Sequence, residues 1–153
     1  MLSSFTAHST TNSFATVALE SFKRFSSGMS PAEAFASTGV NEMSKLTKFW
    51  TVQDKHTTRR FPDNPILSTP SLIGMMELTC EAQTDHKLPG GFATVGFKFD
   101  PMLHLGPAKP GDEVRIEAVL SKIDGRKLVY EVEAKVDNRV IGTCKHTRVV
   151  VGK

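Results

Sequence analysis

The sequence predicts an α+β fold, in which a curved antiparallel sheet covers one long helix. Two observations lead to this prediction. Residues 68–81 form one long, mainly apolar segment, near whose start Pro70 suits the first turn of a helix. Residues 92–151 read as four successive strands separated by turns, and residues 46–61 read as one strand before the helix. A single apolar helix has to be covered on most sides, and one strongly curved sheet can do this.

Composition indicates one globular domain with an extension. The chain has 153 residues, of which 39% are hydrophobic and 23% charged. Its formal net charge of +3 comes from scattered residues, so we expect no nucleic-acid partner. Cys80 and Cys144 lie far apart without metal-type spacing, and the histidines are dispersed; we therefore expect no metal site. No apolar run approaches the roughly 20 residues that cross a bilayer, so no membrane span is expected.

Residues 1–29 differ from the rest of the chain. They are rich in Ser and Thr, and Glu20 is their single acidic residue. Such a segment is typical of a mitochondrial transit peptide, and the alternative is a disordered tail or an additional helix. The location therefore stays open between the mitochondrial matrix and the cytoplasm.

A short helix and a linker are expected over residues 30–45. Ser30 is placed to cap this helix, Pro31 suits its first position, and Glu33 can reach back to the cap. Gly39 ends the helix, and the main domain is expected to occupy residues 46–153.

The central helix carries one unusual residue. Thr69 is placed to be its N-cap, and apolar side chains between residues 72 and 80 point in nearly every direction, which predicts a helix buried all round. Glu77 is the only charged residue in that stretch. A buried carboxylate is costly unless it is paired or used, and burial would raise its pKa toward that of a general base.

His104 is the residue expected to connect the two ends of this site. About 12 Å of helix separates Thr69 from Glu77, so the two cannot touch directly. His104 lies in an apolar patch after an expected strand irregularity at Pro101, and its imidazole could take a proton while Glu77 orients it. The alternative is an ordinary core histidine. His146, in the last strand, is expected to face solvent or the sheet.

The later strands are defined by alternation and by turns. The segments 113–123 and 127–136 each place apolar side chains on one face, and Asp124-Gly125 forms the turn between them. Asp137-Asn138 turns again into the last strand, residues 139–151.

Several motifs in this order resemble the fluoroacetyl-CoA thioesterase-like family of the hotdog-fold superfamily, over roughly residues 49–151. The motifs are Thr69 followed by Gly74-Met75-Met76-Glu77 and Cys80, then Gly96 before His104, then Asp124-Gly125-Arg126-Lys127-Leu128, and finally Ile141-Gly142 with His146-Thr147-Arg148-Val149. The resemblance implies a sheet wrapped around one helix. It also implies a homodimer that hydrolyses acyl-CoA thioesters at sites near the subunit interface, with no cofactor beyond the CoA of the substrate.

By this resemblance Thr69, Glu77 and His104 are the catalytic residues, and Gly96 and Arg148 bind substrate. The plain alternatives are a bulge or close packing at Gly96 and an ordinary strand-end charge at Arg148. The family's namesake carries phenylalanines in the loop before the threonine, whereas residues 62–67 here contain none. We therefore expect hydrolysis of a thioester other than fluoroacetyl-CoA. The short polar loop and the few aromatic residues near the expected site favour a small acyl group.

Two other functions stay open from the sequence. One is a non-catalytic dimer that binds acyl-CoA, because a fold does not fix a function. The other is a hotdog-fold enoyl-CoA hydratase, for which Asp100 and His104 have about the expected spacing.

Overall fold

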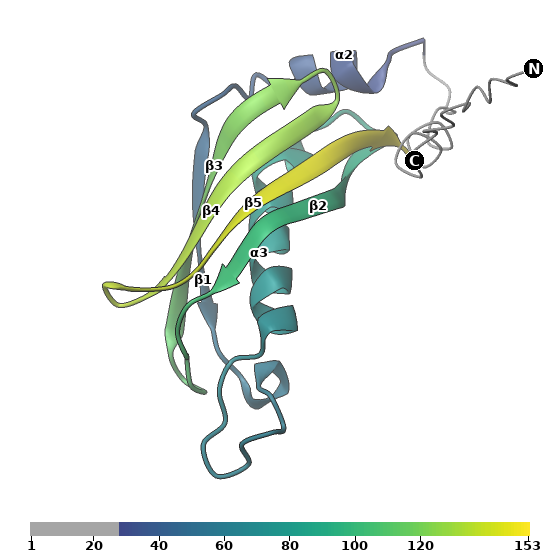
Figure 1. Ribbon diagram of the computed structural model, residues 1–153. Helices are drawn as coiled ribbons and strands as arrows, with labels where there is room; N and C mark the ends of the chain where they lie inside the picture. The colour runs from purple at the N-terminus through teal and green to yellow at the C-terminus, as the bar shows by residue number, and fades with distance from the viewer. Residues whose placement is uncertain (1–27) are drawn as a thin grey trace, which may run out of the picture.

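The computed structural model describes residues 28–153, and the expected transit peptide or tail lies almost entirely outside them (Figure 1). Helix α2 (Pro31–Ala36) is followed by strand β1 (Lys45–Thr51) and the long helix α3 (Thr69–Thr84). Strands β2 (Phe92–His104), β3 (Glu113–Asp124), β4 (Lys127–Val136) and β5 (Arg139–Gly152) complete the chain. Short 3-10 turns, η1 (Asp54–His56) and η2 (Asp85–Lys87), follow β1 and α3. None of the helices described is long and apolar enough to cross a membrane.

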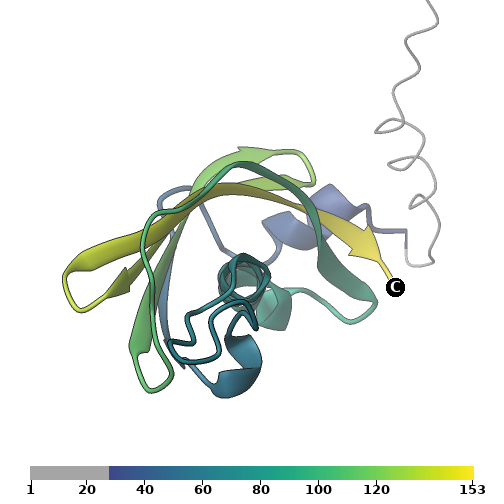
Figure 2. The ribbon, with the colours of Figure 1, turned by 60° about the horizontal axis from the view of Figure 1, so that its bottom comes forward.

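The five strands form one antiparallel sheet in the order β1-β3-β4-β5-β2. The sheet curves around α3, and the view in Figure 2 shows it arching over one side of the helix. This confirms the predicted α+β hotdog architecture. Strand β2 lies at an edge of the sheet, beside β5 and in contact with α3.

The turns and alternating strands agree with the sequence. Asp124 pairs with Lys127, and Gly125 between them has a φ of 57°, which a residue without a Cβ adopts easily. The predicted inner face of β4 is buried: Leu128, Tyr130, Val132, Ala134 and Val136. In β2 the register shifts between Phe99 and Met102, so the expected irregularity at Pro101 is present.

Helix α3 is buried on one side only, so the prediction of burial all round is wrong for this chain. Its buried residues are Leu72, Met75, Met76, Thr79, Cys80, Gln83 and Thr84. Leu78, on the other side, is 46% exposed. The reason is geometric: one five-stranded sheet arches over part of the helix and cannot close around it.

Two local predictions were also wrong. Strand β1 ends at Thr51 rather than near residue 61, because the polar segment after Val52 turns into η1, where the Gln53 amide donates to Nδ1 of His56. The cap of α3 is Ser68, whose hydroxyl accepts from the Ser71 amide, so Thr69 is the first helical residue. In α2 the predicted capping box between Ser30 and Glu33 is confirmed.

Candidate functional site

Glu77 and Gly96 meet where α3 passes over β2. A Cβ built on Gly96 would collide with Oε1 of Glu77, and would lie 3.2 Å from its carboxyl carbon. The carboxylate therefore rests directly on the bare Cα of the strand. The side chain of Glu77 is 36% exposed, so it is half-buried rather than fully buried as the sequence suggested.

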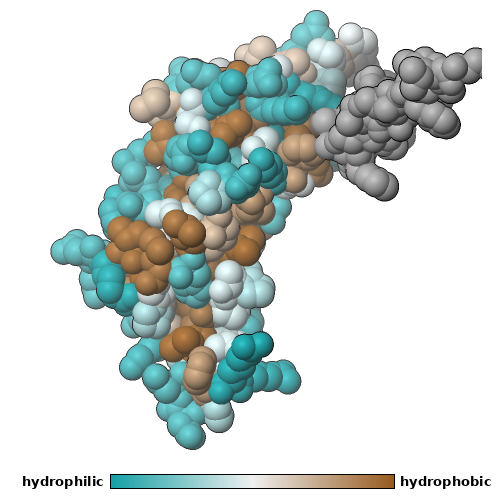
Figure 3. Space-filling model, viewed as in Figure 1, coloured by the Kyte–Doolittle hydropathy of each residue, from teal (hydrophilic) through white to brown (hydrophobic). Residues whose placement is uncertain are grey.

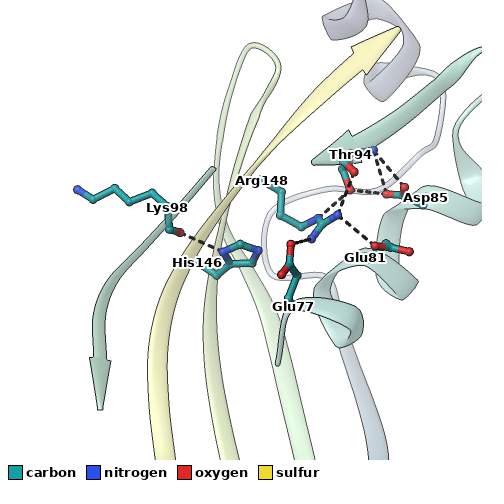
Figure 4. Close-up of polar contacts among 7 residues, drawn as sticks. All are labelled: Glu77, Glu81, Asp85, Thr94, Lys98, His146 and Arg148. Atoms are coloured by element: carbon teal, nitrogen blue, oxygen red, sulfur yellow. Dashed lines mark hydrogen bonds and ion pairs between the residues drawn. The ribbon is translucent and has the colours of Figure 1, made fainter. Parts of the chain in front are cut away.

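Arg148 holds this carboxylate from the neighbouring strand β5, where it is the register partner of Gly96 (Figure 4). Its Nη1 donates to Oε1 of Glu77 at 3.3 Å, and its Nη2 donates to Oε2 of Glu81 at 3.4 Å. The Arg148 side chain is only 1% exposed. A buried guanidinium needs partners for its donors, and the two glutamates of α3 supply part of this need.

Thr94 fixes the other side of the guanidinium. Its hydroxyl accepts from Nε of Arg148 at 2.7 Å, and its carbonyl accepts from Nη2 at 3.0 Å. The same hydroxyl donates to Asp85, whose carboxylate also accepts from the Thr94 amide. Arg148 is thus held in one orientation by Thr94, and that orientation sets where the Glu77 carboxylate lies.

Thr69 and His104 form a second pair at the start of α3. Oγ1 of Thr69 and Nδ1 of His104 are 2.9 Å apart, a hydrogen-bond distance. Because Ser68 caps the helix, the Thr69 hydroxyl is available for this contact. His104 is the last residue of β2, opposite Gly142 in β5. The structure thus brings together two of the three residues that sequence and resemblance assigned to catalysis.

The Thr69–His104 pair and the Glu77–Arg148 pair lie apart within one chain. Eight residues of helix separate Thr69 from Glu77, which is about 12 Å along the axis. Within the described part of the chain, His104 is hydrogen-bonded to Thr69, whereas Glu77 is bonded to Arg148. The expected bridge through His104 is therefore half formed in the isolated chain.

His146 was expected to face solvent or the sheet, and it instead lies buried within this site. It is fully buried, its Nδ1 donates to the Lys98 carbonyl at 3.0 Å, and its ring stacks on Phe99 with centroids 3.8 Å apart. Burial lowers the pKa of His146 to about 4, and the nearby Arg148 charge acts in the same direction. The buried residues of β5 include Cys144, His146, Arg148 and Val150, and this alternation could have placed His146 beside Arg148.

The two cysteines do not supply a nucleophile. Both are free and buried, and burial raises the pKa of Cys144 to about 12 and that of Cys80 still further. A thiol that stays protonated is a poor nucleophile. Within residues 28–153, no group of three or more His, Cys, Asp or Glu side chains is placed to hold a metal ion.

Comparisons with known proteins agree with the fold. Residues 51–153 match the family described as fluoroacetyl-CoA-specific thioesterase. The fluoroacetyl-CoA thioesterase of Streptantibioticus cattleyicolor is 26% identical over 121 residues, which cover 74% of this chain and 86% of that protein. The 3-hydroxyacyl-[acyl-carrier-protein] dehydratase FabZ of Sinorhizobium medicae is 31% identical over 104 residues, covering 67% of this chain and 68% of that protein.

Solved structures show the same fold. The fluoroacetyl-CoA thioesterase FlK superposes with a TM-score of 0.68 at 24% identity, covering 74% of this chain and 90% of that one. A thioesterase superfamily member from Thermus thermophilus superposes with a TM-score of 0.67 at 26% identity, covering 74% and 85%. The family match covers strands β2 to β5 and helix α3, which carries Glu77. The chain therefore belongs to the fluoroacetyl-CoA-specific thioesterase family.

Proposed function

We propose that this chain hydrolyses the thioester of a small acyl-CoA to the free acid and CoA, with Glu77 as the base. Thioesterase activity follows from the family; the size of the acyl group and the role of each residue are our proposal. The observation that carries the proposal is the placement of Glu77, half-buried, against Gly96 and paired with Arg148. A carboxylate fixed in this way can accept a proton from a nucleophile without moving.

The same contacts support the roles that we assign to Gly96 and Arg148. The guanidinium of Arg148 already donates to Thr94, Glu77 and Glu81, so we assign it to positioning Glu77 rather than to binding the acyl group. Gly96 leaves room for the carboxylate, and the register of β2 shifts between Gly96 and Lys98. A bulge there can turn a backbone N–H toward the thioester carbonyl, which is how the developing oxyanion would be stabilised. The close approach of α3 to β2 favours a short acyl group.

A homodimer would bring the two pairs of residues together. Ile73 lies midway between Thr69 and Glu77, so two α3 helices crossing antiparallel near Ile73 and Gly74 place Thr69 opposite Glu77 of the partner subunit. Gly74 offers no side chain to obstruct the crossing. Leu78 on α3 and two residues of the edge strand, Phe97 and Leu103, are 40–48% exposed, and hydrophobic side chains are visible on the surface in Figure 3. An unpaired edge strand and an apolar helix face are both suited to a second copy.

The first experiment measures thiol release from short, medium and aryl acyl-CoAs by wild type and Glu77→Gln. We expect turnover on a short acyl chain and a loss of about a hundredfold in kcat in the variant. Glu81→Gln is the matched control, because Glu81 also contacts Arg148 but lies farther along the helix. Equal rates in wild type and Glu77→Gln would make Glu77 a structural residue. No turnover by folded, dimeric protein would favour a non-catalytic acyl-CoA-binding dimer.

The second experiment tests the shared site by mixing two inactive variants. Thr69→Ala and Glu77→Gln subunits, unfolded together and refolded, should regain about a quarter of the wild-type activity, since half of the dimers are mixed and each mixed dimer has one intact site of two. A site built within one chain would stay inactive in every combination. That result would contradict the shared site and leave the thioesterase assignment in place.

The similarity to FabZ supports one alternative, hydration or dehydration of an acyl thioester. In this chain Asp100 pairs with Lys98, at 2.8 Å, and His104 bonds to Thr69, so the two residues expected for a hydratase have different partners. The same assay separates the reactions. A hydratase changes the absorbance of an enoyl-CoA without releasing thiol.

A further inference from the structure

We propose that His146 is a further catalytic residue, whose Nε2 binds the attacking water together with the Glu77 carboxylate. This inference rests on the proposed thioester hydrolysis. It also assigns the attacking oxygen to a water molecule at the Glu77 end of the site.

The first argument is the hydrogen bonding of the imidazole. Nδ1 of His146 lies 3.0 Å from the Lys98 carbonyl, and a carbonyl can only accept, so Nδ1 carries the proton. In the neutral ring Nε2 is then an acceptor. Among the described residues, Nε2 is one of three buried side-chain nitrogen or oxygen atoms without a hydrogen-bond partner. Buried polar atoms are usually paired, so an orphaned acceptor in a functional site indicates a ligand that donates a hydrogen bond.

The second argument is the position of this acceptor. A Cβ on Gly96 would meet both the carboxylate of Glu77 and, at 3.5 Å, Cε1 of His146. Cε1 is the ring atom next to Nε2. Figure 4 shows the second ring nitrogen pointing toward the Glu77 carboxylate. Both groups therefore lie over the bare Cα of Gly96, at the place where the register of β2 shifts.

The third argument is the chemistry that these two groups share. A carboxylate and a neutral imidazole nitrogen are both acceptors, so they cannot bond to each other. One water molecule satisfies both, because it has two O–H donors. The lone pairs of its oxygen are then directed away from both groups, toward a thioester carbon. The pKa of His146, lowered by burial and by Arg148, keeps the ring neutral and therefore an acceptor near neutral pH.

The reaction then proceeds with fixed roles. The water oxygen forms the new bond to the thioester carbon while one of its protons passes to Glu77, and the other stays hydrogen-bonded to Nε2. The C–S bond breaks next, and the CoA sulfur leaves with the proton from Glu77. The products are a carboxylic acid and a thiol, and His146 is unchanged throughout.

Two substitutions of His146 distinguish this role from a purely structural one. His146→Asn can keep the donor to the Lys98 carbonyl but has no atom at the position of Nε2. His146→Gln can place its carbonyl near that position but loses the bond to Lys98. We expect kcat to fall about tenfold to a hundredfold in His146→Asn, with KM unchanged, and to stay within a few-fold of wild type in His146→Gln. The reverse order, with His146→Asn nearly as active as wild type, would overturn the proposal.

A high-resolution crystal structure of the substrate-free protein separates this inference from the proposed function. A water within hydrogen-bond distance of both Nε2 and Glu77 is the expected result. If that water is present but no thioester is hydrolysed, the proposed function fails while the water site stands. If Nε2 has no water, the inference is overturned, whatever the activity of the enzyme.

Discussion

The carboxylate of Glu77 rests on the Cα of Gly96, on the side where any other residue carries its Cβ. This contact links the helix to the edge strand at the centre of the proposed site. It also explains why position 96 requires glycine although its backbone is not left-handed. A larger residue is excluded because Oε1 of Glu77, the proposed base, fills the space that a Cβ would need.

Gly96→Ala should therefore remove activity by displacing Glu77. The new methyl group would collide with Oε1, and the carboxylate would have to leave its place beside Arg148. We expect a loss of about tenfold to a hundredfold in kcat, the range typical of a misplaced general base. Gly90→Ala is the control, since nothing lies within 4 Å of a Cβ there. If Gly96→Ala keeps full activity, Glu77 does not act from its present position.

At the start of α3, two adjacent residues carry hydroxyl groups that we expect to have different roles, one structural and one functional. Ser68 caps the helix, while Thr69 bonds to His104. Ser68→Ala should lower the free energy of unfolding by about 1 kcal/mol. Thr69→Ala should change it by less than about 0.5 kcal/mol but reduce thiol release, and Thr69→Ser should restore the activity. Urea unfolding and the thiol assay, run on all three variants, measure both effects. Loss of stability in Thr69→Ala without loss of activity would reverse the assignment.

The sequence was sufficient for the fold because each element has a local signal. The alternation in residues 127–136, the Asp124-Gly125 turn and the Ser30-Pro31 cap all depend on neighbouring residues, and all are present in the structure. Glu77 was found because a lone charge in an apolar helix is visible in the sequence alone. These features require no knowledge of which segments meet in space.

The pairing of side chains could not be predicted in the same way. Arg148 joins Thr94, Glu77 and Glu81, which are up to 71 residues away in the chain. The cap at Ser68 instead of Thr69 is a shift of one residue, which pattern alone does not resolve because both hydroxyls suit the position. The exposed side of α3 was missed for a different reason. An apolar helix predicts that its surface is buried, but not whether the residues that bury it belong to the same chain.

Arg148→Met should destabilise the protein more than the loss of an exposed ion pair does. The substitution leaves Thr94, Glu77 and Glu81 without their common donor, although both glutamates still reach solvent. We expect the free energy of unfolding to fall by about 2–3 kcal/mol, below the larger cost of a fully buried unpaired charge. Arg115→Met is the matched control: its pair with Glu117 is partly exposed, with the Arg115 side chain 44% exposed, and a surface pair is worth at most about 1 kcal/mol. Equal losses in the two variants would contradict a structural role of the Arg148 network.

Acid should weaken the folded state through His146. The pKa of this residue is about 4 in the folded chain, lowered by burial, against about 6.5 for an unperturbed histidine. As the pH falls below 6.5, the unfolded chain binds a proton that the folded chain does not. The stability contributed by neutral His146 is therefore complete above pH 6.5, declines between about pH 6.5 and 4, and levels off below. The full difference corresponds to about 3 kcal/mol.

His146→Phe isolates this contribution, because the phenyl ring can still stack on Phe99 but does not titrate. Urea unfolding of both proteins between pH 7 and 4 gives the difference in their free energies, in which the other titrating groups largely cancel. We expect wild type to lose about 3 kcal/mol relative to His146→Phe over this range. Parallel pH profiles would mean that the imidazole takes up a proton in the folded state, in which case Nε2 would become a donor to Glu77 instead of an acceptor for water.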